Sequence, residues 1–135
     1  MEIIRTISEL RARLSSEDQV CCVPTMGNIH DGHLSLVRIG KERAPIVVTT
    51  VFVNRLQFGQ SDDFSRYPRT FEDDCAKLES LGNDIVFCPN EDEMYPEPQV
   101  FFIEPPKIAN GLEGRFRPGH FRGVCTVVTK LFNAV

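Results

Sequence analysis

Apolar residues occur along this sequence in two patterns: short continuous runs, and positions spaced three or four apart. The continuous runs lie within 20–23, 46–53 and 84–88, the last of which begins with Asp84. The run at 46–53 consists almost entirely of β-branched residues, which is typical of a strand buried on both faces of a parallel sheet. We therefore predict three strands at these positions, and a strand-like segment at Val100–Ile103 within a proline-rich stretch.

The spaced apolar positions predict helices between and after these strands. Thr6 and Glu9 fit a capping box ahead of the first helix, and Thr70 is a second N-cap candidate. Pro45 and Gly82 mark the ends of the next two helices. The predicted helices cover about 7–14, 33–43, 71–81 and 120–133.

Strands that alternate with helices at this spacing predict a single α/β domain with a parallel sheet and right-handed crossovers. Ligands bind such sheets at the carboxyl ends of the strands, so the segments after 20–23 and 46–53 form the candidate site. The second segment contains Gln57. It continues into a polar stretch, predicted to be a mobile surface loop, with Ser61, Asp62, Asp63 and Ser65.

The segment after the first strand has the features of a phosphate-binding loop. Gly27 and Gly32 allow the backbone to approach a ligand closely, and the helix that begins near His33 offers unpaired N–H groups to an anion. The imidazoles of His30 and His33 can donate hydrogen bonds to a phosphate. With Gln57 on the same rim of the sheet, these features indicate a nucleotide-type site. Two ordinary surface histidines are one alternative, and a zinc site is a weaker one, because no further ligands stand nearby at finger spacing.

Composition and charge narrow the class of protein. The 135 residues are 41% hydrophobic and 25% charged, and the formal net charge of -4 argues against nucleic acid or an anionic membrane as the main partner. The first residues contain no signal-peptide core, and the longest apolar run, at 44–53, is too short to span a bilayer. Five cysteines without framework spacing predict reduced thiols in a cytoplasmic protein.

Five segments spread over essentially the whole chain carry a set of motifs. They lie at 24–33, 52–58, 67–70, 93–96 and 112–124, and the first reads Pro-Thr-Met-Gly-Asn-Ile-His-Asp-Gly-His. In this order they resemble the pantoate–β-alanine ligase family. His-x-Gly-His alone would show only the wider superfamily of nucleotidyl-transferring enzymes. The implied fold is a Rossmann-like parallel sheet of the His-x-Gly-His nucleotidyltransferase type, with residues 1–135 in an N-terminal nucleotide-binding domain.

The resemblance implies a ligase that uses ATP with Mg²⁺ and works in two steps. The carboxylate of pantoate attacks the α-phosphorus of ATP, which gives pantoyl adenylate and pyrophosphate. The amine of β-alanine then attacks the activated acyl carbon and releases pantothenate and AMP. Fixed N–H and imidazole donors suit the charge that develops on phosphate oxygens, and the remaining catalysis is positioning.

The resemblance also implies roles for single residues. His33 matches the family's proposed proton donor, His30 a second phosphate contact, and Gln57 the glutamine that holds pantoate and lies near β-alanine. The ATP loop comprises Met26, Gly27, Asn28, Ile29, His30, Asp31, Gly32 and His33. Positions that line or border the pantoate pocket are Phe52, Arg117, Val127 and Val128. These last four would otherwise be core residues or, for Arg117, an ion-pair partner, and no metal ligand is assigned.

Two features depart from the family pattern. Arg55 stands where the family usually has proline, which loosens that turn and adds positive charge near a carboxylate site. The family also continues beyond Val135, with segments that supply a lysine, an arginine and a second glutamine, and with a small C-terminal lid domain that joins a homodimer.

We therefore expect a truncated nucleotide-binding domain, inactive alone or only nucleotide-binding. Its strand at 20–23 should form an open sheet edge that promotes self-association. Two other functions stay open: a complete small His-x-Gly-His nucleotidyltransferase, which would form a nucleotidyl product without an amide, and a non-catalytic adenylate-binding module, which would bind without turnover.

Overall fold

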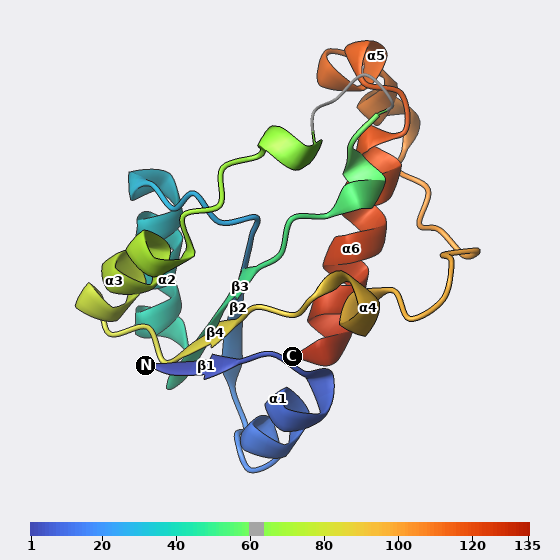
Figure 1. Ribbon diagram of the computed structural model, residues 1–135. Coiled ribbons are helices and arrows are strands. Elements are labelled where there is room, and N and C mark those ends of the chain that lie inside the picture. Colours follow the sequence, from blue (N-terminus) through green and yellow to red (C-terminus); the bar gives the residue numbers. More distant parts are fainter. Residues whose placement is uncertain (60–63) are drawn as a thin grey trace.

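A computed structural model describes residues 1–59 and 64–135 of the chain. Its centre is a sheet with strand order β1-β4-β3-β2, in which all neighbours are parallel (Figure 1). The strands are β1 (Glu2–Ile4), β2 (Val20–Thr25), β3 (Ile46–Val51) and β4 (Ile85–Phe87). The three predicted strands and the parallel α/β sheet are confirmed. Of the predicted surface loop, Ser61, Asp62 and Asp63 lie outside the described residues.

One strand was not predicted, and two expectations about the strands are corrected. The sequence does not predict β1, because its three residues become a strand only by pairing with the distant β4. The run at Val100–Ile103 is not a strand: it lies outside the sheet, and Val100 and Phe101 are 74% and 84% exposed. β2 does not break at Pro24 but continues to Thr25, which is possible because β2 lies at an edge of the described sheet, where a missing N–H costs no ladder bond.

The predicted helices are present, with small shifts at their ends. The four long helices are α1 (Ile7–Leu14), α2 (Asp31–Arg43), α3 (Phe71–Ser80) and α6 (His120–Ala134). Shorter helical turns are η1 (Arg55–Gln57), η2 (Phe64–Arg66), α4 (Glu91–Met94), η3 (Lys107–Asn110) and α5 (Glu113–Phe116). Helix α2 begins two residues before the expected start. Thr70 precedes α3, as expected, but makes no side-chain capping bond.

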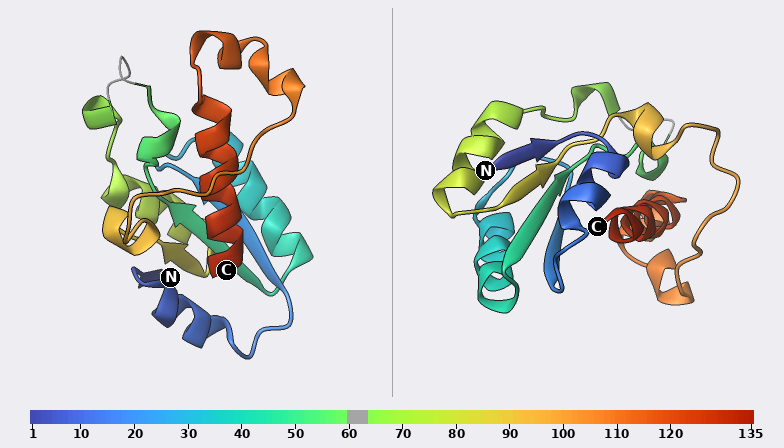
Figure 2. Two further views of the ribbon diagram at one scale, coloured as in Figure 1. Left: turned by 90° about the vertical axis from the view of Figure 1, so that its right-hand side faces the viewer. Right: turned by 90° about the horizontal axis from the view of Figure 1, so that it is seen from below.

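Two apolar cores cover the two faces of the sheet, because successive residues of a strand point to opposite sides. On one face, Val47 and Val86 pack with Val37 of α2 and Leu78 of α3. On the other face lie α1 and α6 (Figure 2), and its core includes Val48, Phe52, Ile85, Phe87, Leu10, Leu14, Val127 and Leu131. Strand β3, which lies between β4 and β2, is thus buried on both faces, as predicted.

The cysteines are free thiols in this structure. Cys21 and Cys22 are both half-buried, because β2 lies at the edge of the described sheet. Burial, followed by the charge of the neighbouring Cys21, raises the pKa of the Cys22 thiol to about 12, which makes it unreactive at neutral pH. Within the described residues, no helix combines the length and apolar character that crossing a membrane requires.

Candidate functional site

The loop between β2 and α2 turns back on itself through a left-handed backbone. Gly27 and Asn28 have φ angles of 81° and 51°. A Cβ on Gly27 would stand 3.1 Å from Asp74 Oδ2 and 3.2 Å from a methyl of Val51, in addition to the cost of its φ angle. The close approach expected at Gly27 is therefore an approach to the protein itself.

Most N–H groups of this loop are already bound within the protein. Gly27 N donates to Thr25 Oγ1 at 3.1 Å. Asn28 N and Ile29 N donate to the two carboxylate oxygens of Asp74, at 2.9 and 2.7 Å. The amides of Asn28 and Ile29 therefore hold the loop to α3, and donors for an anion must come from the residues that follow, at the start of α2, where the sequence placed them.

Those donors are arranged by a capping box built from the two histidines. His30 Nδ1 accepts from Gly32 N at 3.1 Å, and His33 Nδ1 accepts from His30 N at 3.4 Å. Because Nδ1 accepts in both rings, each neutral imidazole carries its proton on Nε2 and keeps that N–H for a ligand. The ring centroids lie 4.0 Å apart. The sequence motif thus places two imidazole donors side by side at the start of α2.

Backbone and electrostatics add to this donor set. Within the described part of the chain, the amide of Asp31 in the first turn of α2 has no acceptor, and it lies at the end of the helix that attracts anions. Burial, and then the neighbouring His30, lowers the pKa of His33, while Asp74 opposes the shift. His33 is therefore neutral at pH 7 and acts as a hydrogen-bond donor through Nε2.

A cavity of about 240 Å³ opens beside His33, between the carboxyl ends of β2 and β3 and the face of α6. It brings together residues that the sequence singled out, namely Met26, His33, Phe52, Gln57, Val127 and Val128. The remaining lining residues are Pro24, Thr25, Tyr67, Val124 and Leu131. Tyr67 belongs to one of the recognised motifs but was given no role. Apolar side chains form most of the wall, and the polar side chains among the lining residues are Thr25, His33, Gln57 and Tyr67.

The orientation of the Gln57 amide follows from its neighbours. Asn54 is fully buried and its Nδ2 must face the carbonyl of Gly123, which can only accept, at 3.1 Å. The same Nδ2 donates to Gln57 Oε1 at 3.0 Å, and Asn54 Oδ1 accepts from Tyr95 Oη at 2.8 Å. Gln57 Oε1 is thus occupied, which leaves its Nε2 donors for the cavity.

Helix α6 supports the same turn from the other side. A Cβ on Gly123 would overlap the carbonyl of Leu56, so glycine is required for α6 to approach η1 this closely. The carbonyl of Gln57 accepts from His120 Nδ1 at 2.8 Å and from Arg117 Nη2 at 3.3 Å. Arg117 does not line the cavity; it holds the backbone of Gln57 from outside.

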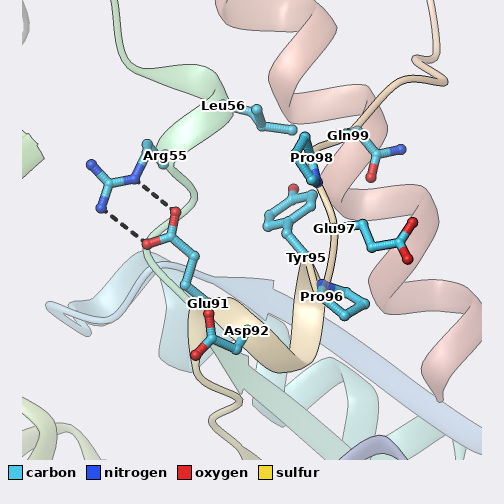
Figure 3. A pocket seen from close by; sticks show the side chains of 9 residues that line it. All are labelled: Arg55, Leu56, Glu91, Asp92, Tyr95, Pro96, Glu97, Pro98 and Gln99. Carbon is cyan, nitrogen blue, oxygen red and sulfur yellow. Dashed lines mark hydrogen bonds and ion pairs between the residues drawn. The ribbon is translucent and has the colours of Figure 1, made fainter.

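The sequence suggested that Arg55 adds positive charge near the site, but in the structure this charge is paired. Its guanidinium forms two hydrogen bonds with the Glu91 carboxylate, at 2.7 and 3.0 Å, and lies over the ring of Phe64. Figure 3 shows this pair beside Tyr95 and Pro98. These residues line a separate pocket of about 330 Å³. The carboxylate neutralises Arg55, and η1 supplies the turn that proline would favour.

A zinc site needs several ligand side chains close together. Within the described residues, no three His, Cys, Asp or Glu side chains lie together in a way that could hold a metal ion. The zinc alternative therefore has no ligand set in this part of the chain.

Comparison with known proteins decides the family. The family model described as Pantoate-beta-alanine ligase matches residues 2–135. The chain belongs to the pantoate–β-alanine ligase family. A pantothenate synthetase from Chromobacterium violaceum is 60% identical over 136 residues, and one from Nitrosospira multiformis is 56% identical over 135. Both alignments cover 100% of this chain, but 49% and 48% of the relatives, so the chain spans about half the length of these curated relatives.

Solved structures of family members share the fold. The pantothenate synthetase from Thermus thermophilus superposes with a TM-score of 0.94 at 46% identity, over 100% of this chain and 49% of that one. The Francisella tularensis ligase, solved with β-γ ATP and β-alanine, gives a TM-score of 0.92 at 39% identity, over 99% of this chain and 53% of that one. The fold is the Rossmann-like fold of the nucleotidyltransferase type that the sequence predicted.

Proposed function

We propose that the protein carrying this chain joins pantoate to β-alanine at the expense of ATP, through a pantoyl-adenylate intermediate. The observation that carries the proposal is one cavity lined by both His33, from the loop before α2, and Gln57, together with apolar side chains. Family membership supports it, as does the Francisella ligase solved with β-γ ATP and β-alanine. Residues 1–135 would form the N-terminal part of the nucleotide-binding domain of this enzyme.

The loop Met26–His33 binds the phosphates of ATP in this proposal. The Nε2–H groups of His30 and His33 and the open amide of Asp31 donate to phosphate oxygens. As charge grows on the α-phosphate, these fixed donors stabilise it without moving. His33 is the catalytic donor, because it alone of the two histidines lines the cavity and its lowered pKa keeps its ring neutral, with the proton on Nε2, at neutral pH.

Pantoate occupies the cavity itself. Its two methyl groups fit against apolar wall residues such as Phe52, Val127 and Val128, and its oxygens accept from Gln57 Nε2. The carboxylate then lies between Gln57 and His33, on the side from which it attacks the α-phosphorus. Holding both reactants in one place supplies the rest of the rate enhancement.

Mg²⁺ is proposed to arrive with ATP as part of the substrate, since Mg²⁺ is commonly bound through substrate phosphates. A cytoplasmic location is supported by the five free thiols, and a homodimer is supported by the family resemblance. Light scattering of the intact protein would test the dimer.

The test is a product analysis on the intact protein that carries this chain. With MgATP, pantoate and β-alanine, AMP and pantothenate should form in equal amounts. Without β-alanine, pantoyl adenylate and pyrophosphate should appear and then stop at one enzyme equivalent. A nucleotidyl product with no amide would instead show a nucleotidyltransferase, and ATP binding without either product would show a binding module.

A further inference from the structure

Asp74 is a buried acid that the proposed reaction does not use. It lies on α3, is 1% exposed, and accepts three hydrogen bonds: from Asn28 N, from Ile29 N and from Thr70 Oγ1 at 3.1 Å. Two of these donors come from the loop before α2, about 45 residues away in the sequence. We infer that Asp74 is a positioning residue, whose carboxylate fixes the loop that aims His30 and His33.

The loop conformation explains why a carboxylate stands here. Positive φ angles at Gly27 and Asn28 turn two successive amides, those of Asn28 and Ile29, toward the same point. Two N–H donors and one hydroxyl converge on that point, so the group that receives them needs two accepting oxygens and no donor. An ionised carboxylate meets this need. An asparagine amide does not, because its NH₂ would face one of the backbone N–H groups.

A second side chain from the same helix holds the other side of the loop. Lys77 Nζ donates to the carbonyl of Ile29 at 2.9 Å. Asp74 and Lys77 are three residues apart on one face of α3, so together they hydrogen-bond the N–H and the C=O of Ile29. The Ile29 side chain is 2% exposed, in the core beside Leu78.

These two contacts of Ile29 fix the positions of His30 and His33, the proposed donors to the nucleotide. Ile29 precedes His30, which caps α2 and whose own N–H sets the ring of His33. A change in the Ile29 peptide therefore turns both imidazoles, although Asp74 itself would touch no substrate. The Gln57 side of the cavity is held separately, by Asn54 and Gly123. Loss of the Asp74 contacts should weaken the ATP side and spare the pantoate side.

The experiment compares Asp74→Asn with Asp73→Asn, the same chemical change at the exposed neighbouring position of α3. In the intact protein, D74N should raise the KM for ATP or slow adenylate formation by roughly tenfold or more, with the KM for pantoate changed less than about twofold. D73N should leave both unchanged. Lys77→Met should act in the same direction as D74N but less, and Lys77→Arg should restore ATP binding.

Two results would overturn the inference: D74N no different from D73N toward ATP, or D74N weakening ATP and pantoate equally, which is general destabilisation. If D74N does not fold, the Lys77 pair decides in the same way, with equal ATP binding by K77M and K77R counting against the inference.

The inference rests on the proposed nucleotide site, so calorimetric titration of ATP accompanies the assays. Wild-type protein that binds ATP but forms no pantothenate contradicts the proposed function alone. Wild-type protein that binds no ATP overturns the inference.

Discussion

The cavity has a histidine wall, formed by His33 at the start of α2, and a glutamine wall, formed by Gln57 after β3. Different groups hold these two walls in place. The histidine wall is fixed by an ionised carboxylate and an ammonium group from α3, on one face of the sheet. The side chain of Gln57 is oriented by neutral groups of Asn54, Gly123 and Tyr95, while Arg117 and His120 hold its backbone carbonyl. Since the two supports share no residue, ATP and pantoate binding should respond to separate sets of substitutions.

The largest effect is expected on the histidine wall. His33→Ala should slow adenylate formation by roughly 10²–10³-fold, the usual size for losing one preorganised donor to developing negative charge. Pantoate affinity should change little, because Gln57 keeps its own support. Single-turnover formation of pantoyl adenylate measures the step, and a near wild-type rate would remove His33 from the catalytic role.

Gln57→Ala should affect the opposite wall. Without Gln57 Nε2, an oxygen of pantoate loses its donor, at a cost of about 1–3 kcal/mol in binding. ATP affinity should stay close to that of the wild type. Calorimetric titration with each ligand measures both, and equal weakening of the two would mean that the walls are not independent.

Tyr95→Phe should give a smaller change of the same kind. The variant removes the donor to Asn54 Oδ1, so among the described contacts the Asn54 amide that orients Gln57 keeps the Gly123 carbonyl as its remaining anchor. Burial raises the pKa of Tyr95 to about 12, so this hydroxyl remains a donor throughout the neutral range. The KM for pantoate should rise about fivefold, as expected for a hydrogen bond worth about 1 kcal/mol. A changed KM for ATP with an unchanged KM for pantoate would contradict the role of Tyr95 in orienting Gln57 through Asn54.

The histidine wall should also show a pH signature. Because the folded pKa of His33 is lowered, the unfolded chain binds more protons just below about pH 6.5, and the stability that neutral His33 contributes is lost as pH falls through this region. NMR titration of the His33 ring should give a midpoint below that of free histidine. Replacing His30 with alanine should move the midpoint upward, since the charge of His30 is one cause of the shift. No movement would leave burial as the only cause.

Arg55→Pro is expected to have the smallest effect. The Arg55–Glu91 pair is largely exposed, and such pairs contribute little to stability. Proline is well suited to the first position of a helical turn, which Arg55 occupies in η1. The KM for pantoate should change less than about twofold. A larger change would show that the ion pair supports the glutamine wall after all.

Local patterns were enough to predict the sheet, its long helices and the residues that begin the site. The run at 46–53 predicted β3 because consecutive β-branched residues favour a strand by their local composition alone. The strand predicted at Val100–Ile103 was wrong, because this run has the composition of a strand but pairs with no strand of the described sheet. Likewise, Glu2–Ile4 has little strand signal of its own and depends on β4.

The supports of the site could not be predicted in the same way. Asn54, Asp74 and Tyr95 act through contacts between residues 41 to 69 positions apart, which no local spacing encodes. One signal was available for Asp74: it precedes Leu78 by four residues, so it lies on the buried face of an amphipathic helix, where a carboxylate needs a partner.

The position of β2 at the edge of the described sheet has a consequence for hydrogen exchange. Thr25 directs its carbonyl to β3, where it accepts from Phe52 N. Because strand residues alternate in direction, Val20, Cys22 and Pro24 turn their backbone polar groups the other way. Pro24 has no amide, so the open side of β2 offers the exchangeable protons of Val20 and Cys22. Any strand that docks there, from the same protein or another, would be reported by slowed exchange at these amides alone.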